Sequence, residues 1–272
     1  MFKYKNNFSV ILIQIMLFIG PPFGNYFGMF HHFNNKNNNS ISVIHGSFTK
    51  DERTGLFSQI IKTLRYSFQH NGWINCIGLR NPGIQYAIQK KLGQKNDIVS
   101  IAIKKETDIE YYKKYIPENT NIEINISCPN STVLNNNMIS TFLNGKRKWC
   151  IVKLSPLEKD ETIDRLYNLG FRQFHCCNTL PLYKQIKEKN IFRGGLSGPS
   201  LIPYVCNKIH YIKHKYSDTI VIAGGGIQSI DTIELYKKHG ADHFAVSTIC
   251  FNPLRFAFFY HQYINHFHFR NK

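Results

Sequence analysis

Acidic residues are scarce in this 272-residue chain, which holds 17 Asp and Glu against 34 Lys and Arg and so carries a formal net charge of +17. Such an excess favours an anionic partner: a phosphorylated cofactor, an acidic substrate or a nucleic acid. Dense runs of Lys and Arg are lacking, so no nucleic-acid partner is expected. The chain is rich in Lys, Asn and Ile, so part of the positive charge reflects its general composition rather than a binding site. A small anionic ligand is therefore the expected partner.

Paired cysteines are missing as well. The chain has seven cysteines, an odd number, and none of them forms a C-x-x-C pair. Neither a disulfide framework nor a zinc site is therefore indicated, and no metal is expected. Free thiols are typical of a reducing compartment, which predicts a cytoplasmic location.

A long apolar run is also lacking. Residues 8–19 (FSVILIQIMLFI) are mostly apolar, but a membrane-spanning helix needs about 20 such residues. Basic residues precede the stretch and a Gly-Pro-Pro turn ends it, yet no small-x-small cleavage motif follows. We interpret residues 1–21 as an N-terminal apolar segment that forms a buried first strand. A targeting segment, or membrane association through residues 8–19, is the alternative. Residues 22–272 are expected to form a single domain.

The chain does contain a regular alternation of predicted strands and helices. Further strands are predicted at residues 42–44, 73–77, 98–103, 122–126, 150–154, 174–177, 220–223 and 243–246. Helices are predicted at residues 54–66, 84–92, 108–115, 138–143, 161–169, 203–214 and 229–239. This alternation indicates parallel βαβ units. With about eight strands and no dinucleotide fingerprint near the N-terminus, it favours an α/β fold of the (β/α)8 TIM-barrel type over an open doubly wound sheet.

Polar and glycine-rich segments follow the predicted strands, at the end where barrels build their active sites. They are GLRNPG (78–83), SCPNS (127–131), Asn178-Thr179, GGLSG (194–198), Gly224-Gly225-Gly226 and Ser247-Thr248, and Lys153 lies within a strand. Glycine lets backbone amides approach an anion, and a helix N-terminus adds partial positive charge. The last two segments therefore predict a phosphate site after the last two strands. Tight packing of glycine turns is the alternative.

In combination these segments resemble the dihydroorotate dehydrogenase family of FMN-containing barrels. The matching stretches run in the family's order from Pro22 to Arg255: PFGNYFG, HGSFT, NCIGLRNPG, EINISCPN, VKLSP, CCNT, GGLSG, AGGGI and VST. The resemblance implies a flavoenzyme with FMN at the C-terminal face of the strands. It would oxidise dihydroorotate to orotate in de novo pyrimidine (UMP) biosynthesis. A base would take a proton from one ring carbon while hydride leaves the adjacent carbon for N5 of FMN.

The resemblance also implies residue roles. Cys128 would be the catalytic base, as in the soluble class of the family, and a thiol, whose ordinary pKa is about 8.5, suits that role. Asn75, Asn125, Asn130, Asn178 and Thr179 would bind the substrate, because amides offer both donors and acceptors to a pyrimidine. Lys153 would stabilise the negative charge of reduced flavin. FMN contacts are expected from Gly46, Ser47, Asn75, Asn125, Lys153, Asn178, Ser197, Gly198, Gly225, Gly226, Ser247 and Thr248.

One departure weakens the assignment of the substrate. The family places a lysine near the start of the barrel, but the corresponding place here is about Gly46, and PFGNYFG has no lysine either. Arg80, which can pair with a carboxylate, and His45 are candidate replacements. The alternatives are another FMN-dependent oxidoreductase that acts on a different pyrimidine-like or unsaturated substrate, or a catalytically decayed flavin-binding homologue. The electron acceptor is not indicated by the sequence, and a homodimer is compatible with the resemblance.

Overall fold

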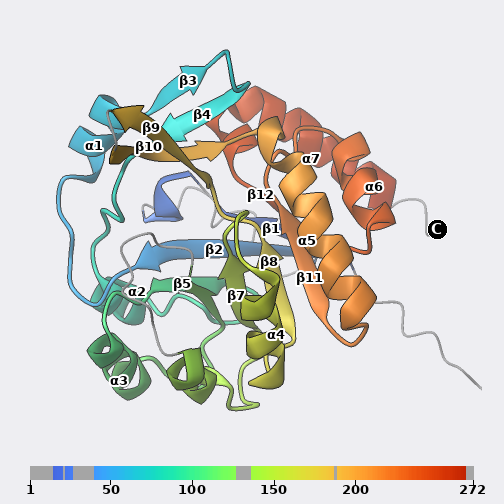
Figure 1. The fold of residues 1–272 in the computed structure, drawn as a ribbon. Helices are drawn as coiled ribbons and strands as arrows, with labels where there is room; N and C mark the ends of the chain where they lie inside the picture. Colours follow the sequence, from blue (N-terminus) through green and yellow to red (C-terminus); the bar gives the residue numbers. More distant parts are fainter. Residues whose placement is uncertain (1–14, 21, 27–39, 127–135, 187–188, 268–272) are drawn as a thin grey trace, which may run out of the picture.

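Eight parallel strands close into a barrel in the computed structural model, which describes residues 15–20, 22–26, 40–126, 136–186 and 189–267. The barrel strands are β1 (Leu17–Ile19), β2 (Ile41–Phe48), β5 (Ile98–Ala102), β6 (Ile122–Asn125), β7 (Cys150–Leu154), β8 (Gln173–Cys176), β11 (Ile220–Gly224) and β12 (His243–Val246). They are hydrogen-bonded in the order β1-β12-β11-β8-β7-β6-β5-β2, and β1 closes the ring by pairing with both β12 and β2. The prediction of a TIM barrel is confirmed (Figure 1).

Helices lie outside the barrel (Figure 1). They are α1 (Leu56–Thr63), α2 (Ile84–Gln89), α3 (Glu106–Tyr115), α4 (Asp160–Asn168), α5 (Ile202–Lys215), α6 (Ile230–Lys238) and α7 (Pro253–Phe267). Short 3-10 turns lie at η1 (Pro22–Asn25), η3 (Asn136–Phe142), η4 (Pro199–Leu201) and η5 (Thr248–Phe251). The helix predicted at residues 138–143 is thus the 3-10 turn η3.

Alternate residues of each barrel strand face opposite sides, as the period of two in a strand requires. In β6, Ile122 and Ile124 join the large cluster that packs strands against helices. The intervening Glu123 faces the barrel interior, where it meets His175 and Lys153. A second, separate cluster packs in the barrel interior: Met16, Phe18, Ile44, Ile98, Trp149, Ile151, Ile222 and Ala245. The end of the interior that holds Glu123, Lys153 and His175 is the polar end, and the apolar cluster adjoins it, because Ile44 and Ala245 also line the cavity there.

A second sheet of four strands, in the order β3-β4-β10-β9, lies beside the barrel (Figure 1). Its strands are β3 (Arg65–Ser67), β4 (Gly72–Asn75), β9 (Leu180–Ile186) and β10 (Lys189–Ser197), all paired antiparallel. The strand predicted at residues 73–77 is thus real, but counting it among the barrel strands was wrong. The helix predicted at residues 54–66 ends earlier, at Thr63, because the chain turns into β3.

The N-terminal apolar segment contributes β1, which contains the last three residues of the predicted first strand. All three are fully buried, and Leu17 donates its backbone N–H to the carbonyl of Ser40 at 2.8 Å. Among the described residues, no helix has the length and apolarity needed to cross a membrane. Residues 1–14 lie outside the described residues, so the division at residue 21 stays a prediction.

Phe18 tests whether β1 is an integral part of the barrel. Its side chain is 0% exposed, and its ring centroid lies 5.3 Å from that of Trp149 and 6.0 Å from that of His243. Phe18→Ala should lower the free energy of unfolding by about 3–5 kcal/mol, because it leaves a cavity in the interior. Urea denaturation measures this change.

Phe68→Ala is the matched control, because Phe68 is 90% exposed and its removal should change stability by no more than about 0.5 kcal/mol. Equal stabilities of the two variants would show that β1 does not hold the barrel closed.

Candidate active site

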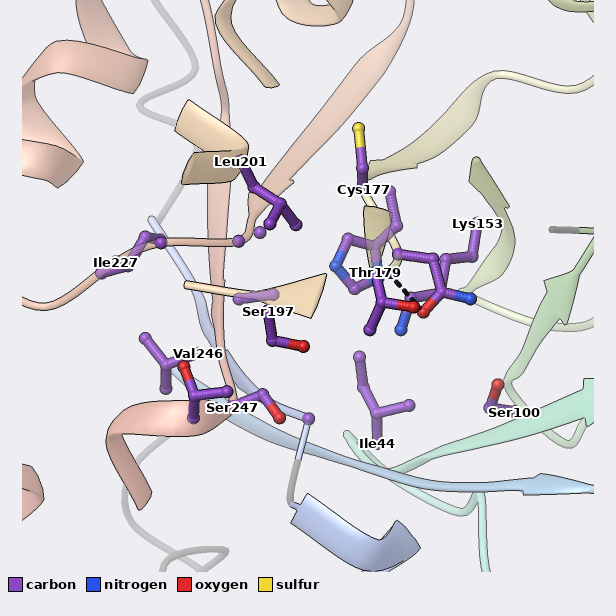
Figure 2. A pocket seen from close by; sticks show the side chains of 18 of the residues that line it. Ile44, Ser100, Lys153, Cys177, Thr179, Ser197, Leu201, Ile227, Val246 and Ser247 are labelled. Carbon is purple, nitrogen blue, oxygen red and sulfur yellow. Dashed lines mark hydrogen bonds between the residues drawn. The ribbon is translucent and has the colours of Figure 1, made fainter. Parts of the chain in front are cut away.

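A cavity of about 780 Å³, counted out to its open mouth, lies at the polar end of the barrel. Strands β6, β7 and β8 contribute Glu123, Lys153 and His175 to its lining. The remaining lining residues are Gly20, Ile44, Gly46, Ser47, Ser100, Cys177, Asn178, Thr179, Ser197, Gly198, Leu201, Gly224, Gly225, Gly226, Ile227, Ala245, Val246, Ser247 and Thr248. Figure 2 shows the hydroxyl-bearing Ser197 and Ser247 at one side of this space and Lys153 at the other.

The side with the two serines is built from backbone. Gly198 has φ +140°, and a Cβ there would lie 2.8 Å from the Cα of Gly72. Gly226 has φ +75°, and a Cβ there would lie 3.0 Å from the carbonyl oxygen of Gly198. The two glycine turns therefore touch, and side chains larger than hydrogen would separate them. Such bare backbone, with the hydroxyls of Ser247 and Thr248 nearby, is suited to surround a phosphate.

The opposite side has a buried carboxylate at its floor. Glu123 Oε2 lies 2.6 Å from His175 Nδ1, and Glu123 Oε1 accepts a hydrogen bond from Ser100 Oγ at 2.8 Å. Lys153 Nζ lies 3.8 Å from the same Oε1. Burial alone would raise the pKa of Glu123, but Lys153, His175 and the hydrogen bond from Ser100 together lower it to about 2. The pKa of His175 is lowered by burial and by Lys153, against the opposing effect of Glu123. Ionised Glu123 thus faces a neutral imidazole.

Hydrogen bonds extend from this floor towards the amide side chains. Ser100 Oγ lies 2.9 Å from Ser47 Oγ, which accepts a hydrogen bond from Asn125 Nδ2 at 3.0 Å. Asn178 Nδ2 donates to Asn125 Oδ1 at 3.3 Å. The network joins β2, β5 and β6 with the loop after β8, so the orientation of both amides is set by neighbouring strands.

Most of the residues predicted from the sequence to contact FMN line this cavity. They are Gly46, Ser47, Lys153, Asn178, Ser197, Gly198, Gly225, Gly226, Ser247 and Thr248, together with Thr179 from the predicted substrate set. Asn125 adjoins the cavity through its bonds to Ser47 and Asn178. Cys128 and Asn130 lie outside the described residues.

Three predicted residues lie away from the lining. Asn75, at the end of β4, donates to the carbonyl of Gly195 at 3.4 Å. Arg80 Nη1 donates to the carbonyl of Thr54 at 3.1 Å, and His45 Nε2 lies 3.3 Å from Asp97 Oδ2. The structure does not bring the two candidate replacement cations, Arg80 and His45, to the cavity. Their roles stay predictions.

The sequence predicted no site role for Ser100, Glu123 or His175, although all three line the cavity. The signal that could have identified them is the alignment of residues between neighbouring strands. Strands β7 and β8 pair Lys153 with His175, so the two side chains face the same way. Among the described residues, no group of three or more His, Cys, Asp or Glu is arranged to hold a metal ion.

Comparison with known proteins gives a consistent result. The family model described as dihydroorotate dehydrogenase matches residues 28–257. The chain is 31% identical over 234 residues to the dihydroorotate dehydrogenase B (NAD(+)) catalytic subunit of Staphylococcus carnosus, which covers 76% of this chain and 74% of that protein. It is 30% identical over 217 residues to the catalytic subunit of the same name from Halalkalibacterium halodurans, with 70% of each chain covered.

A solved structure of the dihydroorotate dehydrogenase of Eimeria tenella, in complex with ferulenol, is similar in fold. The TM-score is 0.62 at 17% identity, and the match covers 85% of this chain and 74% of that one. The closed barrel, the glycine-lined cavity at the carboxyl ends of its strands and the match over residues 28–257 together place the chain in the dihydroorotate dehydrogenase family.

Proposed function

We propose that this protein is an FMN-dependent dihydroorotate dehydrogenase that oxidises dihydroorotate to orotate. The observation that carries the proposal is the division of one cavity into a side of glycine turns with Ser197 and Ser247 and an opposite side with Lys153 (Figure 2). A mononucleotide has the matching division into phosphate and ring. The two curated relatives described above bear the name of this activity, which supports the substrate assignment.

The lining fits FMN on both sides. Gly198, Gly225 and Gly226 would hold the phosphate through backbone N–H groups, with Ser247 and Thr248 adding hydroxyl donors. Lys153 would lie at the ring, where a cation stabilises the charge of the reduced cofactor. FMN supplies the hydride acceptor of the reaction. The chain's own residues bind it, orient it and handle the proton.

Proton removal falls to Cys128 in this proposal. The segment SCPNS comes shortly after β6, so Cys128 lies three residues after Asn125, whose amide is held by Ser47 and Asn178. The thiolate would accept one ring proton, while the adjacent carbon loses hydride. Asn130, Asn178 and Thr179 would bind the pyrimidine edge. Asn75 would contribute from β4.

A different substrate is the second candidate function. Lys153 is paired with Glu123 at 3.8 Å, and the described lining holds no further lysine or arginine. A cavity with this charge balance also suits an unsaturated or pyrimidine-like substrate without a carboxylate. The two candidates differ in whether dihydroorotate itself delivers electrons.

The first prediction is that the purified protein binds FMN and that dihydroorotate bleaches its flavin absorbance under anaerobic conditions. Stopped-flow absorbance measures the reaction. If dithionite bleaches the bound FMN but dihydroorotate does not, the substrate assignment is wrong and the cofactor assignment stands. If the protein binds no FMN, the cofactor assignment fails as well.

The second prediction concerns the base. Cys128→Ala should slow flavin bleaching by dihydroorotate by about 10²–10⁴-fold, the usual contribution of a positioned general base. Cys76→Ala is the matched control, since Cys76 is exposed and does not line the cavity, and its rate should equal that of the unaltered protein. A normal rate in Cys128→Ala would remove Cys128 from the mechanism.

A further inference from the structure

The ionisable side chains of the described cavity lining are Glu123, Lys153, His175 and Cys177. Ionised Glu123 and protonated Lys153 form a pair at 3.8 Å, so their charges cancel across the floor. His175 is the third group of this floor, and it is 3% exposed. Among these groups only the imidazole of His175 can add a positive charge to the floor, because the ordinary pKa of a histidine lies close to neutrality.

The geometry fixes how His175 can take a proton. An ionised carboxylate only accepts hydrogen bonds, so Nδ1 of His175 carries the hydrogen that it shares with Glu123 Oε2 at 2.6 Å. In the neutral ring Nε2 is then the acceptor. Gly224 makes room for this atom, because a Cβ at residue 224 would lie 2.5 Å from His175 Nε2. Both His175 and Gly224 line the cavity.

We propose that His175 takes up a solvent proton at Nε2 when negative charge accumulates on the cavity floor, so that the cavity gains one positive charge as the bound cofactor is reduced. This inference rests on the proposed function. Dihydroorotate would give one proton to the base and one hydride to FMN. Because a hydride is one proton with two electrons, its transfer would add one negative charge to the bound cofactor. The proton added to His175 balances that charge.

The groups around His175 favour a neutral imidazole before reduction and a protonated imidazole after it. Glu123 faces it from β6 and Lys153 from β7, while β5 contributes the uncharged Ser100 and β11 contributes Gly224. Burial and Lys153 hold the pKa of His175 below its usual value of 6.5. A new negative charge opposes both effects and raises that pKa, since an opposite charge nearby favours the protonated form. Glu123 is placed to stabilise the imidazolium through the existing bond to Nδ1.

His175 also offers an answer to the missing family lysine. Neither Arg80 nor His45 lines the cavity, whereas His175 does. In this proposal His175 carries a positive charge only when the cofactor is reduced, whereas a lysine would carry one permanently.

The test is the midpoint potential of the FMN-loaded protein, measured by dithionite titration against reference dyes at several values between about pH 5 and 8. For a two-electron couple each proton taken up contributes about 30 mV per pH unit. The unaltered protein should show a slope of about 59 mV per pH unit in the range where His175 gains its proton. His175→Asn should reduce the slope there to about 30 mV per pH unit.

His243→Asn is the matched control, because His243 is another buried histidine of a barrel strand but does not line the cavity. It should keep the steeper slope. A His175→Asn variant that also keeps it would assign the second proton to another group and overturn the proposal.

A second measurement needs no variant to fold. Imidazole ¹⁵N resonances of the FMN-loaded protein should show one buried histidine that is neutral when the flavin is oxidised and protonated when it is reduced at the same pH. Histidines that all keep their state on reduction would overturn the inference while FMN binding still supports the proposed function. If FMN does not bind, both fail together.

Discussion

The buried carboxylate of Glu123 is the constraint around which the polar end of this barrel is arranged. A charge enclosed by protein is costly unless partners satisfy it, and removing one partner of a buried pair typically costs about 3–5 kcal/mol. Here the partners come from three other strands: Ser100 on β5, Lys153 on β7 and His175 on β8. Because each partner also lines the cavity, the contacts that stabilise the carboxylate also determine the shape of the site.

The opposite side of the cavity is determined by space rather than charge. Gly198 and Gly226 approach each other so closely that side chains would not fit between the turns. Gly198 follows β10, a strand of the four-stranded sheet, whereas Gly226 follows the barrel strand β11. The glycine-rich side of the cavity thus forms where the two sheets meet, and the floor belongs to the barrel alone. A ligand that spans both sides connects the small sheet to the barrel.

The alternation of strands and helices predicted the barrel, and the polar and glycine residues near the carboxyl ends of the strands predicted many of the residues that line the cavity. Lys153, Asn178 and Gly225 were found in this way, and all three line the cavity. Pattern could not say which sheet a strand joins. The strand at residues 73–77 belongs to the second sheet because Asn75 pairs with Gly195, a residue 120 positions away.

The hairpin of β9 and β10 was not predicted at all. Its segment LPLYKQIKEKNIFRGGLS carries several lysines and no clear alternation of apolar and polar residues, so it resembles a loop. His175 was missed for a related reason. Its role depends on Glu123, which lies two strands away on β6, and the sequence pattern does not reveal that these two side chains meet inside the barrel.

Closure of the barrel by β1 has a consequence for how the chain is made. The backbone N–H of Met16 donates to Nδ1 of His243, a residue 227 positions later. At a synthesis rate of about 5–20 residues per second, roughly 10–45 s separate the appearance of the two partners. During that interval β1 can pair with β2, but its other edge has no strand to bind. Throughout that interval the nascent chain therefore carries an apolar, open-edged strand, a state in which strands associate with other chains.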